Sequence, residues 1–273
     1  MINFAKNNDE LDRFNLVQKL VSIASDIAMY NFENRKVVQV KKDLSLVTKI
    51  DKTIERALVN LISNVFPHDG ILGEEITHKS SKSGYLWTID PIDGTIAYVH
   101  DLPLFSTLIG LVFNGRIVLG VASFPALSKV FFAVANHGSY CVTDSLTIKT
   151  HVKLFSTRQP KLGELVFCHS GENYFQKESD KYLFNKIKSF SKYVRSWGDA
   201  YGHIMVAKSS SDIMVDTVLK VWDIVPLKII LEESGNVFFT KPQLNLENRF
   251  QNYLAISCAS KKFIIRLVSE FKE

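Results

Sequence analysis

Apolar residues recur every three or four positions in two stretches near the start of the chain. These stretches, residues 10–30 and residues 50–65, each predict an amphipathic helix with one face packed on a core. Between them, residues 37–40 predict a strand, and Leu46–Thr48 follows after a turn. The chain therefore begins with two helices separated by extended structure.

The middle of the chain favours β-structure. Ser106–Phe113 and Ile117–Phe124 are apolar runs joined by Asn114-Gly115, a dipeptide typical of two-residue hairpin turns. Val130–Ala135 predicts a third strand. The polar residues 143–163, which contain several turn formers, are expected to connect two halves of the molecule.

Strands and helices alternate in the rest of the chain. The expected elements are strands at Leu165–Cys168, Asp212–Asp216, Val237–Phe239 and Leu254–Cys258, and helices at Phe184–Phe190, Gly198–Lys208, Trp222–Glu233 and Ser260–Phe271. This alternation is typical of layered α/β folds. We therefore expect an α+β half over residues 1–142 and an α/β half over residues 143–273, joined in one compact unit.

The composition narrows the functional classes. The chain has 273 residues, of which 46% are hydrophobic and 22% charged, and these values are ordinary for a soluble globular protein. The net charge of +5 is scattered without a Lys/Arg-rich block, which argues against nucleic-acid binding. No uncharged apolar stretch is long enough to span a membrane. The three cysteines lie far apart, as expected for a cytoplasmic protein without disulfides.

Candidate chemistry is concentrated in the stretch from Trp87 to Thr95. Leu86–Ile89 reads as a buried strand, Asp90 is expected at its end, and Asp93-Gly94-Thr95 has the composition of a helix start. Carboxylates attract a hard divalent cation, and free backbone N–H groups attract an anion. A joint metal and phosphate site is one interpretation. Asp-Pro and Asp-Gly pairs are also common turn formers, so a solvated loop is the alternative.

Three other acidic residues are candidates with structural alternatives. Glu74 follows an apolar pair and is expected at a strand's end close to Asp90, although surface Glu-Glu pairs are common. Asp51 lies in the first turn of a predicted helix, where a negative charge complements the helix dipole. Asp223 begins another helix, and spacing alone leaves a helix cap and a further metal ligand equally open. Pro226 is expected in the first turn of that helix, where proline is tolerated.

The Trp87–Thr95 string resembles the Trp-x-x-Asp-Pro-x-Asp-Gly-Thr signature of the inositol monophosphatase superfamily of magnesium-dependent, lithium-sensitive phosphatases. Four more segments match in the family's order: Leu46-Val-Thr-x-x-Asp51, Gly73-Glu-Glu75, Gly198-Asp-Ala200 and Trp222-Asp223. The resemblance implies a layered αβαβα sugar-phosphatase fold and a homodimer. It also implies hydrolysis of a small phosphorylated alcohol by metal-activated water, with two or three Mg²⁺ ions per site.

Carried over position by position, the resemblance assigns metal ligands. They are the side chains of Glu74, Asp90, Asp93 and Asp223 and the backbone carbonyl of Ile92. Carboxylates without histidine or cysteine suit magnesium better than zinc.

The resemblance also assigns the groups that handle the phosphate. Asp93, Gly94 and Thr95 would bind it, the last two through backbone N–H groups. Thr95 together with Glu74 would orient the attacking water, and Asp51 would lie close to the metals through water.

The specificity segments resemble the histidinol-phosphatase branch more than inositol monophosphatases proper. The segments are Asp101–Ile109, Ser196–Gly202 and Ile213–Asp216. The substrate-binding residues implied are Gly198, Asp199, Ala200 and Asp216. Acids at Asp199 and Asp216 would favour a cationic amine such as histidinol phosphate, with inositol monophosphate next, because Asp199 could merely cap a helix and Asp216 could bind polyol hydroxyls.

Two other classes compete with a phosphatase. A non-catalytic partner- or RNA-binding role is the main alternative, but such a protein has no need of the complete set of Glu74, Asp90, Asp93, Thr95 and Asp223. A dinucleotide-binding enzyme is excluded because no Gly-x-Gly-x-x-Gly follows a strand.

Overall fold

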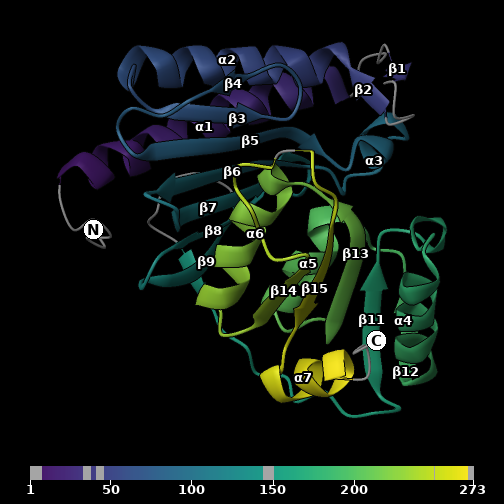
Figure 1. Cartoon of the computed structure of the whole chain (residues 1–273). Helices are drawn as coiled ribbons and strands as arrows, with labels where there is room; N and C mark the ends of the chain where they lie inside the picture. The colour runs from purple at the N-terminus through teal and green to yellow at the C-terminus, as the bar shows by residue number, and fades with distance from the viewer. Residues whose placement is uncertain (1–7, 33–37, 41–45, 144–150, 249, 270–273) are drawn as a thin grey trace.

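The computed structural model describes residues 8–32, 38–40, 46–143, 151–248 and 250–269. Its elements form five layers, helix–sheet–helix–sheet–helix, which confirms the expected αβαβα class (Figure 1). Helices α1 (Asn8–Phe32) and α2 (Lys49–Val65) form the first layer, as their apolar periodicity predicts. They lie on the outer face of an eight-stranded sheet. The short strands β1 (Val38–Val40) and β2 (Leu46–Thr48) pair with each other beside them.

The large sheet has the strand order β10-β9-β8-β7-β6-β5-β3-β4. All neighbouring strands run antiparallel except β3 and β5. In chain order the strands are β3 (Gly70–Gly73), β4 (His78–Lys79), β5 (Tyr85–Asp93), β6 (Ser106–Phe113), β7 (Arg116–Phe124), β8 (Lys129–Val134), β9 (Gly138–Thr143) and β10 (His151–Leu154). Asn114 and Gly115 both have positive φ, 46° and 79°, as the predicted hairpin turn requires.

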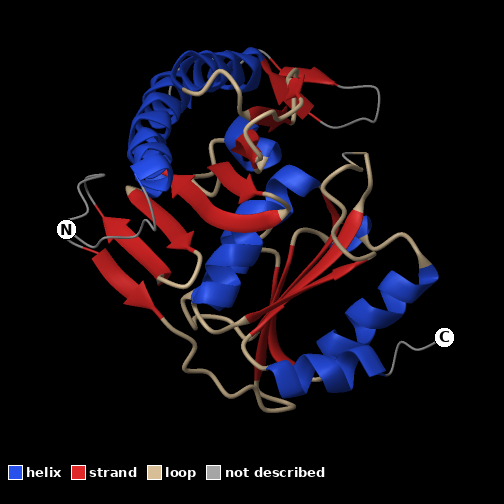
Figure 2. Cartoon of the chain, turned by 60° about the vertical axis from the view of Figure 1, so that its left-hand side comes forward, coloured by secondary structure: helices blue, strands red, loops and turns tan. Residues whose placement is uncertain are grey.

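The small sheet has five strands in the order β12-β11-β13-β15-β14. The pairs β12/β11 and β11/β13 are parallel, and β13/β15 and β15/β14 are antiparallel. Its strands are β11 (Leu165–His169), β12 (Ser191–Arg195), β13 (Ile213–Leu219), β14 (Val237–Lys241) and β15 (Tyr253–Cys258). Figure 2 shows from a second side that helices separate this sheet from the large one.

The remaining helices fill and flank these layers. Between the sheets lie α5 (Asp199–Ala207) and α6 (Val221–Glu233), and the outer side of the small sheet carries α4 (Glu178–Ser189) and α7 (Lys261–Ser269) (Figure 1). Ser260 caps the start of α7, since its hydroxyl accepts the Phe263 N–H at 3.3 Å. The short pieces are α3 (Thr95–Val99), η1 (Pro125–Leu127) and η2 (Glu172–Tyr174).

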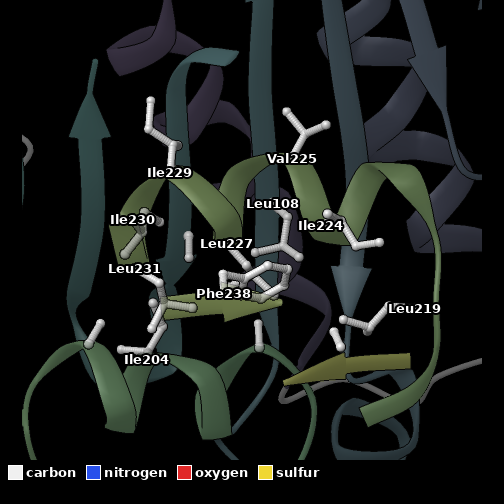
Figure 3. Packing of buried hydrophobic residues seen from close by; sticks show 14 of the residues in the cluster. Leu108, Ile204, Leu219, Ile224, Val225, Leu227, Ile229, Ile230, Leu231 and Phe238 are labelled. Atoms are coloured by element: carbon white, nitrogen blue, oxygen red, sulfur yellow. The ribbon is translucent and has the colours of Figure 1, made fainter. Parts of the chain in front are cut away.

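Two glycines of the large sheet let α6 approach closely. A Cβ at Gly110 would lie 2.5 Å from Val225, and a Cβ at Gly120 would lie 2.5 Å from both Ile229 and the Pro226 carbonyl oxygen. Figure 3 shows Val225 and Ile229 on one side of α6, away from Phe238. The helix is buried on nearly all sides, so its position is fixed by packing against both sheets.

A buried ion pair ties α1 to the large sheet. Arg13 donates two hydrogen bonds to Asp69, at 2.9 and 2.7 Å, and both side chains are almost fully buried. Asp69 also accepts the Trp87 indole N–H at 2.9 Å and the Ser83 hydroxyl at 2.6 Å. The Arg13 guanidinium lies 3.7 Å from the ring centre of Tyr85. This network fixes the first residues of β5.

Several sequence expectations need correction. Strand β5 continues through Asp93, with irregular pairing to β6 between Asp90 and Asp93, so Asp90 is not at the strand's end. Pro226 lies inside α6 rather than in its first turn, and it cannot donate to the carbonyl four residues earlier. Strands β4, β9 and β12 had no clear apolar alternation and were not predicted. The division at residue 142/143 stays a proposal; β10 lies beyond it and pairs with β9.

The structure also bears on the expectations about disulfides and membrane-spanning segments. Cys141, Cys168 and Cys258 are free thiols. Of the helices in the described ranges, none combines the length and apolarity needed to cross a bilayer.

Candidate active site

Three buried aspartates from distant parts of the chain meet where β5 ends and α6 begins. One carboxylate oxygen from each of Asp90, Asp93 and Asp223 lies within 4.8 Å of the other two. Their side chains are 3%, 7% and 8% exposed. We call these three residues the aspartate cluster. The fold thus brings Asp223 next to Asp90 and Asp93, although Asp93 and Asp223 are 130 residues apart in the sequence.

Asp93 is held by hydrogen bonds from both halves of the molecule. Its Oδ2 accepts the Ser106 hydroxyl from β6 at 3.0 Å and the Ala200 backbone N–H from α5 at 3.0 Å. The carboxylate therefore joins the large sheet to the helical layer behind it.

Asp223 caps its helix and also joins the other two acids. It lies in the first turn of α6, and its Oδ2 accepts the Lys220 backbone N–H at 2.7 Å, so it caps the helix. Its carboxylate also belongs to the aspartate cluster. The cap orients the side chain, and the packing of α6 on the large sheet brings it to Asp90 and Asp93.

The cluster carries more negative charge than its surroundings offset. Burial raises the pKa of Asp90 well above its ordinary value, and the charges of Glu74, Asp223 and Asp93 raise it further. Burial, followed by Asp199 and Asp223, likewise raises the pKa of Asp93, although its two hydrogen bonds oppose the shift. Burial and then Glu74 raise the pKa of Asp223 to about 8, against the opposing Lys220 N–H.

Glu74 lies beside the cluster but outside the group of three. It is half-buried and follows β3, and its backbone N–H donates to the Ile89 carbonyl at 3.0 Å. Its effect on the pKa values of Asp90 and Asp223 places its carboxylate on their side of the sheet. Because β3 and β5 are parallel neighbours, their C-terminal ends meet at one edge.

Gly94 and Thr95 form the turn that leaves the cluster. Gly94 precedes α3 with a φ of 77°, a left-handed conformation that favours glycine. The first helical hydrogen bond of α3 runs from the Tyr98 N–H to the Gly94 carbonyl. The N–H of Thr95 lies before this bond in the chain and therefore takes no part in the helical hydrogen bonding. The Thr95 hydroxyl donates to the Ile92 carbonyl at 3.1 Å. Ile92, whose side chain is buried, thus has its carbonyl beside Thr95.

Asp51 is brought near α3 rather than into the group of three. It is 1% exposed in the first turn of α2. Burial first, and then the Asp51 charge, raise the pKa of Tyr98, whose hydroxyl donates to the Ala28 carbonyl at 3.0 Å. Asp51 therefore lies close to the α3 segment that begins at Thr95.

A second pair of acids, one buried (Asp216) and one partly exposed (Asp199), adjoins the turn. Asp199 opens α5, and its Oδ2 lies 3.1 Å from the position that a Cβ on Gly94 would take. Burial and then Asp216 raise the pKa of Asp199 to about 7. Asp216 accepts the Ser170 hydroxyl, and burial raises its pKa despite that bond. We call Asp199 and Asp216 the acidic pair.

The other predicted substrate residues shape this region through their backbones. A Cβ at Gly198 would lie 2.7 Å from the Ser170 Cα, so the two segments touch. Ala200 contributes the N–H that binds Asp93. Tyr174 is close enough that both acids, after burial, raise its pKa.

Sequence reasoning missed several residues around the site. The missed side chains are Glu55, Ser106, Ser170 and Tyr174. Glu55 stands four residues after Asp51 and therefore on the same face of α2, a signal that could have drawn attention to it. The other three are separated in sequence from their partners, and no local pattern marks them.

The donor set of the aspartate cluster suits a hard divalent cation. All of its side-chain donors are carboxylate oxygens, which magnesium and calcium prefer. Asp90 Oδ1 is buried without a hydrogen-bond partner, so an acceptor is left for a cation. A bound cation would also offset the two effects that raise the three pKa values, burial first and the neighbouring negative charges second.

The sequence model of the inositol monophosphatase family matches residues 8–270. The chain belongs to this family. Histidinol-phosphatase of Chlorobaculum parvum is 31% identical over 211 residues, covering 77% of this chain and 78% of the relative. Inositol monophosphatase 1 of Homo sapiens is 27% identical over 223 residues, covering 78% of each chain. The solved structure of Thermotoga maritima IMPase superposes with a TM-score of 0.79 at 26% identity, covering 95% of this chain and 97% of that one.

Family membership supports a functional interpretation of the aspartate cluster. These family relatives are named as phosphatases, which supports phosphomonoester chemistry for this fold. The aspartate cluster lies in the Trp87–Thr95 string and in Trp222-Asp223, two of the segments that carried the resemblance.

Proposed function

We propose that this protein is a magnesium-dependent phosphomonoesterase that acts on a small phosphorylated alcohol. The observation that carries the proposal is the aspartate cluster, in which three buried carboxylates from β5 and α6 converge without an offsetting charge among themselves. A fold that only bound a partner would gain nothing from burying three acids together, because each raises the free energy of the others' charged forms.

The cation ligands in this proposal are the aspartate cluster, Glu74 and the Ile92 carbonyl. Two or three ions per site are proposed from the family pattern. Magnesium bound there would supply positive charge to the nonbridging phosphate oxygens and lower the pKa of a bound water. The chain's own contribution is to hold these oxygens in a fixed, buried arrangement, since Asp93 and Asp223 are each fixed by backbone N–H groups.

The phosphate is proposed to bind over the turn at Gly94 and Thr95. The left-handed conformation of Gly94 turns the chain so that N–H groups precede the first helical bond of α3. Asp93 borders this turn. The Thr95 hydroxyl, placed beside the Ile92 carbonyl, and the Glu74 carboxylate are proposed to orient the attacking water, with Asp51 close by. In-line displacement then needs no covalent intermediate.

Histidinol phosphate is the favoured substrate in this proposal. The acidic pair lies next to the proposed phosphate turn, since Asp199 approaches Gly94. Its two carboxylates repel each other, so a cationic amine on the substrate would be attracted to them. A relative named histidinol-phosphatase at 31% identity supports the same substrate. Inositol monophosphate, whose hydroxyls could also bind Asp216, stands second.

The test is phosphate release from a panel of substrates. The panel contains histidinol phosphate, inositol 1-phosphate, fructose 1,6-bisphosphate, adenosine 3′,5′-bisphosphate and NADP, each with Mg²⁺ and with excess chelator. The expected result is Mg²⁺-dependent release with the highest kcat/KM for histidinol phosphate. Release that persists in chelator would overturn the metal-dependent mechanism.

The role of the acidic pair has its own test. Asp199→Asn is expected to raise the KM for histidinol phosphate by about tenfold or more while changing the KM for inositol 1-phosphate less, because only the first substrate carries an amine. Equal losses on both substrates would remove the proposed amine recognition.

Two properties of the family pattern remain proposals for this chain. Lithium is expected to inhibit phosphate release, and the protein is expected to form a homodimer. Enzyme assays with LiCl against a KCl control test the first property, and sedimentation equilibrium tests the second.

A further inference from the structure

The turn that follows β3 is held by a carboxylate from α2. Glu55 is completely buried, and its two oxygens accept three consecutive backbone N–H groups, from Glu75 at 2.7 Å, Ile76 at 3.0 Å and Thr77 at 2.7 Å. Hydrogen bonds from neutral donors to a charged acceptor are stronger than those between neutral groups. The backbone of residues 75–77, immediately after Glu74, is therefore held by the Glu55 carboxylate.

The residue before Glu74 is fixed by the same side chain. A Cβ at Gly73 would lie 2.3 Å from Glu55 Oε1, so only glycine leaves room for the carboxylate there. The Gly73 N–H donates to the Thr77 carbonyl at 2.8 Å, which closes the turn. The Glu74 N–H is bound to the Ile89 carbonyl, one residue before Asp90.

We propose that Glu55 is a positioning residue for the cation site: by binding the N–H groups of residues 75–77 it holds the Glu74 carboxylate against Asp90. This inference rests on the proposed function, in which Glu74 is a cation ligand. Glu55 itself touches neither substrate nor cation. Outer groups that orient ligands typically change metal affinity by about 10- to 100-fold when they are replaced.

The first experiment measures Mg²⁺ binding to the full-length protein by isothermal titration calorimetry after chelator treatment. Glu55→Gln keeps the side-chain shape but turns an NH₂ group toward backbone donors, so the turn should loosen. The Mg²⁺ dissociation constant is expected to rise at least about tenfold. At saturating Mg²⁺, kcat is expected to fall as well, because the Glu74 carboxylate that Glu55 holds in place is also proposed to orient the attacking water.

Glu233→Gln is the matched control. Glu233 also accepts two backbone N–H groups of a turn, from Asn136 at 2.7 Å and Gly138 at 2.8 Å, but that turn carries no proposed ligand. This variant should change thermal stability without changing the Mg²⁺ dissociation constant. If Glu233→Gln weakens Mg²⁺ binding as much as Glu55→Gln, the effect is a general loss of stability and the inference is overturned.

Gly73→Ala tests the same contact without removing a charge. Its methyl group should displace the Glu55 carboxylate and weaken Mg²⁺ binding in the same direction. It also provides the measurement if Glu55→Gln does not fold, as judged by circular dichroism. Unchanged Mg²⁺ affinity in folded Gly73→Ala would overturn the inference.

A double-mutant cycle identifies the residue through which Glu55 acts. In a Glu74→Gln background, adding Glu55→Gln should produce little further loss of Mg²⁺ affinity, because the positioned ligand is already gone. Fully additive losses would contradict a role through Glu74. If wild-type protein binds no Mg²⁺ at all, the proposed function fails; if it binds Mg²⁺ and Glu55→Gln binds equally well, only the positioning role fails.

Discussion

The two ends of strand β5 bury carboxylates in opposite ways. At the first end, Asp69 accepts two bonds from Arg13 and one from Trp87, so its charge is matched inside the protein. At the other end, the aspartate cluster of Asp90, Asp93 and Asp223 contains no positive partner charge, and burial followed by neighbouring carboxylates raises the pKa values. The difference teaches that buried acids alone do not mark a cation site; buried acids without an internal partner charge do.

The Asp69 end should be the more important for stability. In Asp69→Asn the buried Arg13 loses its counter-charge, and the free energy of unfolding is expected to fall by about 3–5 kcal/mol. Urea denaturation in Mg²⁺-free buffer measures the change. The matched variant is Asp90→Asn, which relieves repulsion and should leave the Mg²⁺-free protein equally stable or more stable. Equal destabilisation by the two variants would break the comparison.

The cluster end should be the more important for activity. Asp90→Asn is expected to lower kcat/KM at least about a hundredfold, because a ligand charge that stabilises the transition state is lost. Phosphate release at saturating Mg²⁺ measures it. Asp69→Asn, assayed at a temperature where it is fully folded, should retain most activity per molecule. A loss below tenfold in Asp90→Asn would contradict the proposed role of the cluster.

Magnesium should stabilise the folded chain through the cluster only. At a Mg²⁺ concentration about 100 times the dissociation constant, unfolding should require about 2.7 kcal/mol more than in chelator. Thermal unfolding over a Mg²⁺ series measures this shift. The shift should disappear in Asp90→Asn and persist in Asp69→Asn; a shift of equal size in both variants would place the cation elsewhere.

His203 is a buried group whose pKa is lowered, whereas the pKa values of the aspartate cluster are raised. It packs in α5 beside Phe238, and burial lowers its pKa to about 3. The unfolded chain therefore binds a proton near pH 6.5 that the folded chain refuses, so stability is lost as the pH falls below 6.5. Between pH 6.5 and 4.5 this amounts to about 2 kcal/mol. In His203→Gln this loss of about 2 kcal/mol between pH 6.5 and 4.5 should disappear; an unchanged pH dependence of the free energy of unfolding would contradict it.

Local patterns predicted the fold and part of the site. The two N-terminal helices and the Asn114-Gly115 hairpin follow from periodicity and turn chemistry, which depend on neighbouring residues. The string ending at Thr95 indicated the acids of β5 for the same reason. Spacing alone could not decide whether Asp223 was a cap or a cluster member, and only the family resemblance grouped it with the other acids, because the answer depends on how α6 packs across the large sheet.

Long-range pairings account for what the sequence did not predict. The partners of Asp69 come from α1 and β5, and those of Glu55 are backbone N–H groups, which leave no side-chain pattern. The extension of β5 to Asp93 depends on pairing with β6. Pro226 lies inside α6 where its carbonyl and Cα approach Gly120 closely, a contact that local propensity does not include.

The attachment of Asp93 to both halves has a consequence for biosynthesis. Its partners Ser106 and Ala200 are synthesised far apart, and Asp223 follows later still. A nascent chain that has been synthesised only through the strands of the large sheet lacks Asp223 and also lacks Ala200, whose N–H binds Asp93. If the cluster holds magnesium as proposed, the ion can enter only when the last third of the polypeptide has left the ribosome. The ion would then bind late and stabilise a chain that is already largely folded, and it would not initiate folding.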